Sequence, residues 1–83
     1  MQEEITINID ETAVILDTIE INVHACNMGN GKAVVMVTEF GEDKVDAVQA
    51  GDLLVFHTQP VWIRVLHVYE GSIQILVGQD TIH

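Results

Sequence analysis

Apolar and polar residues alternate along two stretches in the first third of the chain. Residues 5–9 and 19–25 switch between the two classes at nearly every position, which is the period of a half-buried β-strand. A shorter apolar run at residues 13–16 lies between them. In the stretch 19–25 the odd-numbered residues would face the core. His24 and Cys26 would then project together from the opposite face.

The middle of the chain begins with a turn signal and then loses its alternation. Residues 27–31 read NMGNG, which tolerates positive φ angles and predicts a hairpin turn with residues 32–38 as its return strand. From 42 to 50, the spacing of Val45, Ala47 and Val48 is compatible with one or two helical turns ended by Gly51. An irregular crossover fits the same spacing equally well. We therefore expect at most one short helix here.

The last third reads as a meander of three strands at residues 53–57, 61–69 and 72–77, with turns at 58–60 and 70–71. One face of the middle stretch consists of Val61, Ile63, Val65, His67 and Tyr69, and the other of Trp62, Arg64, Leu66, Val68 and Glu70. Both faces are largely apolar, whereas a one-sided sheet buries a single face. We therefore expect a homo-oligomer in which a second copy covers one face. The expected interface residues are Trp62, Arg64, Leu66 and Val68.

These elements predict a mainly β protein, with residues 1–83 forming a single domain: a small antiparallel β-barrel or sandwich of about six strands. The composition agrees, because 48% of the residues are hydrophobic and only 5% are aromatic, so aliphatic side chains build the core. The single cysteine and the acidic start after Met1 lead us to expect a cytoplasmic protein without a signal peptide. No apolar run approaches the roughly 18 residues of a membrane-spanning helix.

The charge balance is the least ordinary property of the sequence. Thirteen aspartate and glutamate residues accompany three lysine and arginine residues, for a net charge of −10. Such a surface repels nucleic-acid phosphates and anionic membranes, so neither is expected as a direct partner. The acidic residues have two interpretations. Either they keep a chain with a mean hydropathy of +0.29 in solution, or they dock on a basic protein.

A docking face would draw its carboxylates from two parts of the chain. The candidates in the crossover region are Glu39, Glu42, Asp43 and Asp46. The candidates in the N-terminal third are Glu3, Glu4, Asp10, Glu11, Asp17 and Glu20. We therefore expect a small acidic interaction module that binds or inhibits a basic protein, for instance one that itself binds nucleic acid. In size and charge the chain resembles the small acidic proteins of phages and mobile elements that imitate nucleic acid.

The meander is also similar to two known families. Its Gly51-Asp52 start, its long strand with Val-Leu-x-Val and its Gly71 turn resemble the carbon storage regulator family of dimeric RNA-binding proteins. That family reads RNA with basic residues, and only Arg64 is present on these strands, so its activity is not transferred. Gly51-Asp52 and His67 resemble part of the cupin pattern, although the paired histidines and glutamate of the first cupin motif are missing. The two resemblances imply alternative functions: a small-molecule or metal-binding barrel like the cupins, or a β dimer like the RNA regulators.

Few residues could carry chemistry. The pocket of such a barrel would lie around Trp62, His67 and Tyr69. His24 and Cys26 could form half of a zinc site. Its remaining ligands would have to come from His57, His67, His83 or nearby acids, none of which has the spacing of a known motif. No hydroxyl or thiol has a base positioned beside it by sequence pattern. We therefore expect no catalytic residue, metal or cofactor, and no enzyme activity.

Overall fold

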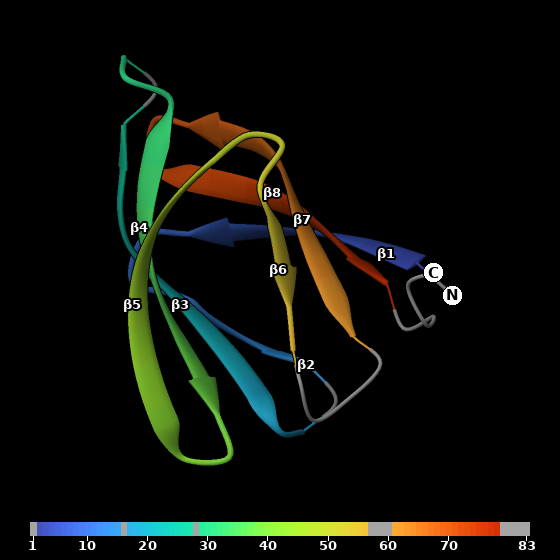
Figure 1. Cartoon of the computed structure of the whole chain (residues 1–83). Coiled ribbons are helices and arrows are strands. Elements are labelled where there is room, and N and C mark those ends of the chain that lie inside the picture. Colours follow the sequence, from blue (N-terminus) through green and yellow to red (C-terminus); the bar gives the residue numbers. More distant parts are fainter. Residues whose placement is uncertain (1, 16, 28, 57–60, 79–83) are drawn as a thin grey trace.

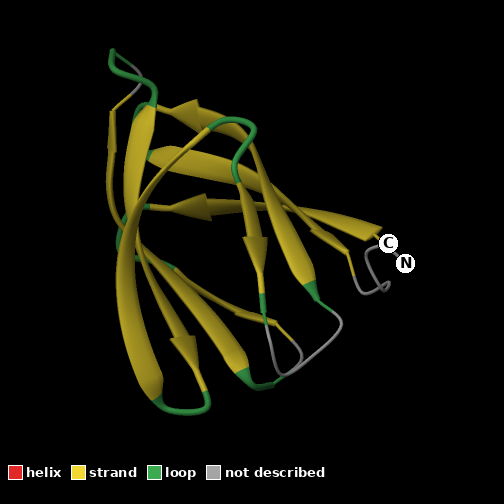
Figure 2. Ribbon diagram, viewed as in Figure 1, coloured by secondary structure: helices red, strands yellow, loops and turns green. Residues whose placement is uncertain are grey.

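The computed structural model describes residues 2–15, 17–27, 29–56 and 61–78. Within these residues the chain forms eight strands and no helix, and so it offers no helix that could cross a membrane. The strands are β1 (Gln2–Asn8), β2 (Thr12–Ile15), β3 (Ile19–Asn27), β4 (Lys32–Glu39), β5 (Glu42–Gln49), β6 (Leu53–Val55), β7 (Trp62–Tyr69) and β8 (Ser72–Gly78). They form two four-stranded antiparallel sheets packed as a sandwich (Figure 1, Figure 2).

The chain visits the strands in a simple up-and-down order. Sheet A has the order β1-β8-β7-β6 and sheet B the order β2-β3-β4-β5. The chain therefore changes sheet twice among the described strands, between β1 and β2 and between β5 and β6. The prediction of an all-β sandwich is confirmed, with more strands than the six expected. The closed-barrel alternative is wrong, because β5 and β6 are edges of different sheets and no ladder joins them in the described chain.

The interior between the sheets is almost entirely branched aliphatic. The largest fully buried side chains are Ile7, Ile19, Ile21, Ile63, Ile73, Ile75, Val23, Val35, Val61 and Val65. Both sheets contribute to this cluster, and among the described residues no polar or charged side chain is buried in it. β-branched residues pack well on pleated surfaces, which explains why a chain poor in aromatic residues builds a continuous core.

Residues 42–49 form a strand, so neither the helical turns nor the irregular crossover considered for this stretch is present. The expectation of at most one short helix is met without any helix in the described residues. β5 pairs with β4 along its whole length, from Glu39 opposite Glu42 to Lys32 opposite Gln49. The turn between them explains why. Phe40 and Gly41 both have positive φ angles, 51° and 82°, as in a two-residue type I′ hairpin. Such a turn places the following residues directly beside the preceding strand, and helical spacing within β5 has no influence on that pairing.

Two β-bulges reverse the predicted direction of several side chains. The register of β3 shifts between Val23 and Ala25, and that of β7 between Val65 and His67. An extra residue at a bulge moves every later residue of the strand to the other face. Cys26 is consequently buried although His24 is exposed. The expectation that these two residues share a face is wrong.

Candidate binding groove between β5 and β6

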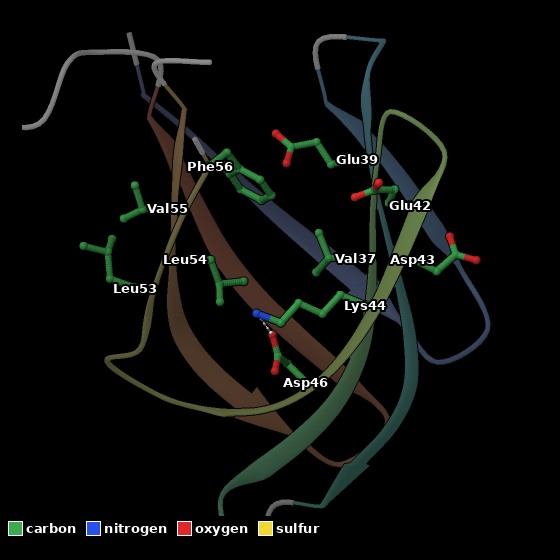
Figure 3. Close-up of a pocket in the computed structure, with 10 residues that line it drawn as sticks. All are labelled: Val37, Glu39, Glu42, Asp43, Lys44, Asp46, Leu53, Leu54, Val55 and Phe56. Carbon is green, nitrogen blue, oxygen red and sulfur yellow. Dashed lines mark ion pairs between the residues drawn. The ribbon is translucent and has the colours of Figure 1, made fainter. Parts of the chain in front are cut away.

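The open edge between the two sheets contains a groove of about 390 Å³. It lies where β5, the last strand of sheet B, meets β6, the last strand of sheet A (Figure 3). The lining residues are Val37, Glu39, Glu42, Asp43, Lys44, Asp46, Leu53, Leu54, Val55 and Phe56. We call the lining residues from β4 and β5 the acidic wall, and residues 53–56 the apolar wall.

The acidic wall arises because charged residues occupy inward positions of β5. Opposite residues of an antiparallel pair share a face. Lys44 is opposite Val37, which is buried, and Val48 of β5 is itself 3% exposed. Glu42, Lys44 and Asp46 lie on the same side as Val48, the side that faces the other sheet. Inward-pointing charges at an edge strand keep the sandwich open along this line and discourage pairing with other edges.

The carboxylates of this wall are only partly compensated. Glu39 and Glu42 are directly opposite each other next to the hairpin turn, an arrangement that is unfavourable for like charges. The Asp43 carboxylate accepts a hydrogen bond of 2.6 Å from the Thr38 hydroxyl. Lys44 Nζ lies 3.5 Å from Asp46 Oδ2, and Lys44 extends into the space between the walls (Figure 3). Glu39, Glu42 and Asp46 are on the groove side of this wall, where Lys44 is the one lysine among the lining residues, so the groove is negatively charged. The Asp43 carboxylate lies on the opposite face of β5.

The apolar wall comes from β6 and the residue that follows it. Leu54 is opposite the buried Ile63 of β7, and both Leu54 and Phe56 pack against the core. Leu53 and Val55 alternate with them and remain 41% and 56% exposed. The groove therefore has charge on one side and hydrocarbon on the other, and core-facing side chains contribute to both walls.

The structure brings together the four acidic residues that the sequence predicted in the crossover region. Glu39, Glu42, Asp43 and Asp46 all line the groove. The six candidates of the N-terminal third are exposed and line no part of it. Sequence reasoning missed the apolar wall. The signal was present at residues 53–56, which read LLVF without the alternation expected of a half-buried strand.

The predicted oligomer interface does not lie on one face. Trp62 and Arg64 are on the outer face of sheet A, opposite the exposed Val55 and Leu53. Leu66 is partly buried at the bulge of β7, and Val68, beyond the bulge, packs against the core. Contrary to the prediction from the alternation, Val68 therefore does not share a face with Trp62 and Arg64, because the bulge turns it inward. The interface itself stays a prediction.

Trp62 has a specific place on this outer face. It is opposite Gly78 of β8, and a Cβ atom added to Gly78 would lie 2.1 Å from the indole Cε2 atom. The ring therefore lies directly over the glycine. His67 and Tyr69, with ring centroids 5.7 Å apart, are both exposed beyond the bulge. The pocket expected around Trp62, His67 and Tyr69 is thus not part of the interior.

The remaining chemical candidates are separated from one another. Among the described residues, no group of three or more histidine, cysteine, aspartate or glutamate side chains could hold a metal ion. His57 and His83 lie outside the described residues. Burial raises the pKa of the Cys26 thiol, and the Glu70 carboxylate raises it further. A protonated thiol is a poor nucleophile and a poor metal ligand.

Comparison of the chain with protein-family models, with curated proteins and with solved structures gives no match. The β5–β6 groove is therefore the feature on which a functional proposal depends.

Proposed function

We propose that the chain is a protein-interaction module whose β5–β6 groove binds a basic segment of a partner protein. The observation that carries the proposal is the acidic wall facing an apolar wall across one open groove. Lysine and arginine side chains have the same division, with an apolar stem and a charged head. The stem can lie against Leu54 and Phe56 while the head approaches Glu42 and Asp46.

Lys44 supports this proposal from within the chain. Its stem enters the groove and its ammonium group lies beside the Asp46 carboxylate (Figure 3). The Lys44 side chain is 77% exposed, so this ion pair is weak and solvated and a competing cation can replace it. The net negative charge that remains favours the binding of further cations.

The competing interpretation is that the acidic residues only keep an apolar chain in solution. In that case their positions would be unimportant, and neutralising any three of them would have the same effect on binding. The chain offers a matched comparison, because Glu3, Glu4 and Asp10 are exposed on β1 and on its connection to β2, at the opposite edge of the sandwich. Three substitutions at either edge remove the same amount of charge.

Calorimetric titration with a short capped peptide in which lysine and valine alternate tests the proposal. Affinity should fall strongly as salt rises from about 0.1 M to about 1 M, since the Debye length shrinks from about 10 Å to about 3 Å. The variant Glu42→Gln, Asp43→Asn, Asp46→Asn should bind at least about tenfold more weakly. The control variant Glu3→Gln, Glu4→Gln, Asp10→Asn should retain most of the affinity. Equal losses in both variants would support the solubility interpretation instead.

We further propose that a second copy covers the outer face of sheet A. Two cross-strand rows support this proposal, Val55-Trp62-Gly78 and Leu53-Arg64-Leu76, because they place a largely apolar patch around one cation. Leu76 is also opposite Glu4 of β1, so a basic and an acidic group lie on the same face. A two-fold axis through such a face can bring Arg64 near Glu4 of the second copy.

A further inference from the structure

The edge of β5 that faces the groove is available for backbone pairing. β5 has β4 on one side and no strand on the other within the described chain. In an antiparallel ladder, the backbone groups of alternate residues point away from the paired strand. Gln49 belongs to the residues whose backbone groups point away from β4. Its N–H donates to Asp52 Oδ2 at 3.0 Å and its carbonyl accepts from the Asp52 N–H at 3.1 Å, and Asp52 lies beyond the open edge. Asp43, Val45 and Ala47 are six, four and two residues before Gln49 in the same strand. Their N–H and C=O groups therefore point toward the open edge as well.

The surface along this edge is hollowed over most of its length. The groove covers the part of β5 from Glu42 to Asp46. A second, smaller depression of about 230 Å³ lies beside the end of the strand and is lined by Lys32, Ala47, Val48, Gln49 and Asp52. An extended segment placed along β5 would therefore meet open space rather than packed side chains. The side chain of Val45 is 61% exposed, and an outward-pointing residue of such a segment would partly cover it.

We propose that the groove takes an extended segment of the basic partner as an additional antiparallel strand beside β5. This inference rests on the proposed function and specifies how the partner binds. Residues of the segment opposite Glu42, Lys44 and Asp46 would point into the groove, where the walls suit lysine or arginine. Residues opposite Asp43, Val45 and Ala47 would point outward and would exchange backbone hydrogen bonds with β5. The recognised sequence therefore alternates basic residues with β-branched or other apolar residues.

The charges of β5 favour a basic segment over the β5 strand of a second copy at this open edge. If the β5 strands of two copies paired, the acidic residues 42, 43 and 46 of one copy would lie beside those of the other, and like charges across a ladder are destabilising. A basic segment makes the same backbone bonds and reverses the sign of these contacts. The inward charges of β5 thus exclude self-pairing and favour a cationic strand.

Two N-methylated forms of the lysine–valine peptide test the binding mode. In the proposed arrangement the lysine side chains enter the groove, so the valine N–H groups face β5 and the lysine N–H groups face away. Methylating the central valine amides should weaken binding by about tenfold or more, because hydrogen bonds to β5 are lost. Methylating the lysine amides should change affinity by less than about threefold.

A substitution in β5 provides the complementary test. Ala47→Pro removes an N–H group on the open edge, where proline is tolerated because the missing group does not bond to β4. It should weaken binding of the unmethylated peptide by about tenfold, whereas Ala47→Ser, which keeps the N–H, should not. If Ala47→Pro does not fold, as judged by circular dichroism, the two methylated peptides still decide the question.

The outcomes separate the two proposals. Salt-sensitive binding that depends on Glu42, Asp43 and Asp46, combined with equal affinity for both methylated peptides, would overturn strand addition and leave the proposed function standing. A larger loss for the lysine-methylated peptide would also overturn the antiparallel arrangement. If the unmethylated peptide does not bind at low salt, both proposals fail.

Discussion

At the scale of single residues, Trp62 and Gly78 explain how the outer face of sheet A tolerates a glycine as the last residue of β8. A glycine in a strand leaves a gap on the sheet surface and weakens the strand. Here the indole from the neighbouring strand fills the gap, since a Cβ at position 78 would lie 2.1 Å from the ring. An aromatic residue lying over a cross-strand glycine compensates for the missing side chain.

Gly78→Ala should therefore displace the indole of Trp62. We expect the free energy of unfolding to fall by about 1–3 kcal/mol, the usual cost of overpacking. Because Trp62 is the only tryptophan, its fluorescence reports the displacement directly, and the emission should shift to longer wavelength. Ser72→Ala, at another position of β8, should leave the emission unchanged. An unshifted spectrum in Gly78→Ala would show that the ring does not lie over the glycine.

Lys44 should compete with any cation that enters the groove. Lys44→Gln removes the ammonium group beside Asp46 and should raise affinity for the lysine–valine peptide by about twofold to fivefold. Arg64→Gln makes the same change in net charge on the outer face of sheet A, away from both depressions beside β5, and should have a smaller effect. If both variants gain the same affinity in this titration, peptide binding depends only on the overall charge of the protein.

At the scale of elements, the β4–β5 hairpin contains a residue that does not suit its turn. Phe40 has a φ of 51° and a side chain that is 59% exposed. The first position of a type I′ turn favours asparagine, and Gly41 already supplies the second. A bulky residue in the left-handed region is strained, and the exposed ring of Phe40 contributes few contacts to offset that strain.

Phe40→Asn should accordingly stabilise the protein. We expect an increase of about 1 kcal/mol in the free energy of unfolding, since asparagine avoids most of the cost of a left-handed backbone. Thermal or urea denaturation measures this change. Phe40→Ala is the appropriate control, because it removes the ring without relieving the strain. A loss of stability in both variants would indicate that the ring makes stabilising contacts.

The elements also show what the sequence could and could not predict. The NMGNG turn and the strands on either side of it follow from residue types that tolerate positive φ and from strict alternation. Cys26 and Val68 were misplaced because a bulge has no signal in the alternation that precedes it. β5 was missed because its inward positions carry Glu42, Lys44 and Asp46. Charged residues at these positions remove the alternation of apolar and polar residues that predicts a strand. The acidic residues of the groove could be identified from their charge. The position of β6 beside them could not, because it depends on how the two sheets pack.

At the scale of the whole molecule, the two proposed surfaces should respond to salt in opposite directions. Two copies with a net charge of −10 repel each other, so screening should strengthen a homodimer while it weakens binding of a basic segment. Light scattering should report a mass approaching twice 9.2 kDa, more completely at high salt. Trp62→Ala should weaken assembly. A mass of 9.2 kDa at every salt concentration would contradict the homodimer.

The most direct test of the groove is a residue-resolved one. Amide chemical shifts of the ¹⁵N-labelled protein should be recorded during titration with the lysine–valine peptide at low salt. If the peptide binds in the groove, the largest changes will cluster at Glu39 to Ala47 and at Leu53 to Phe56, with little change at Glu3, Glu4 and Asp10. Changes spread over all acidic segments, or centred on the outer face of sheet A around Trp62, would contradict binding in the groove.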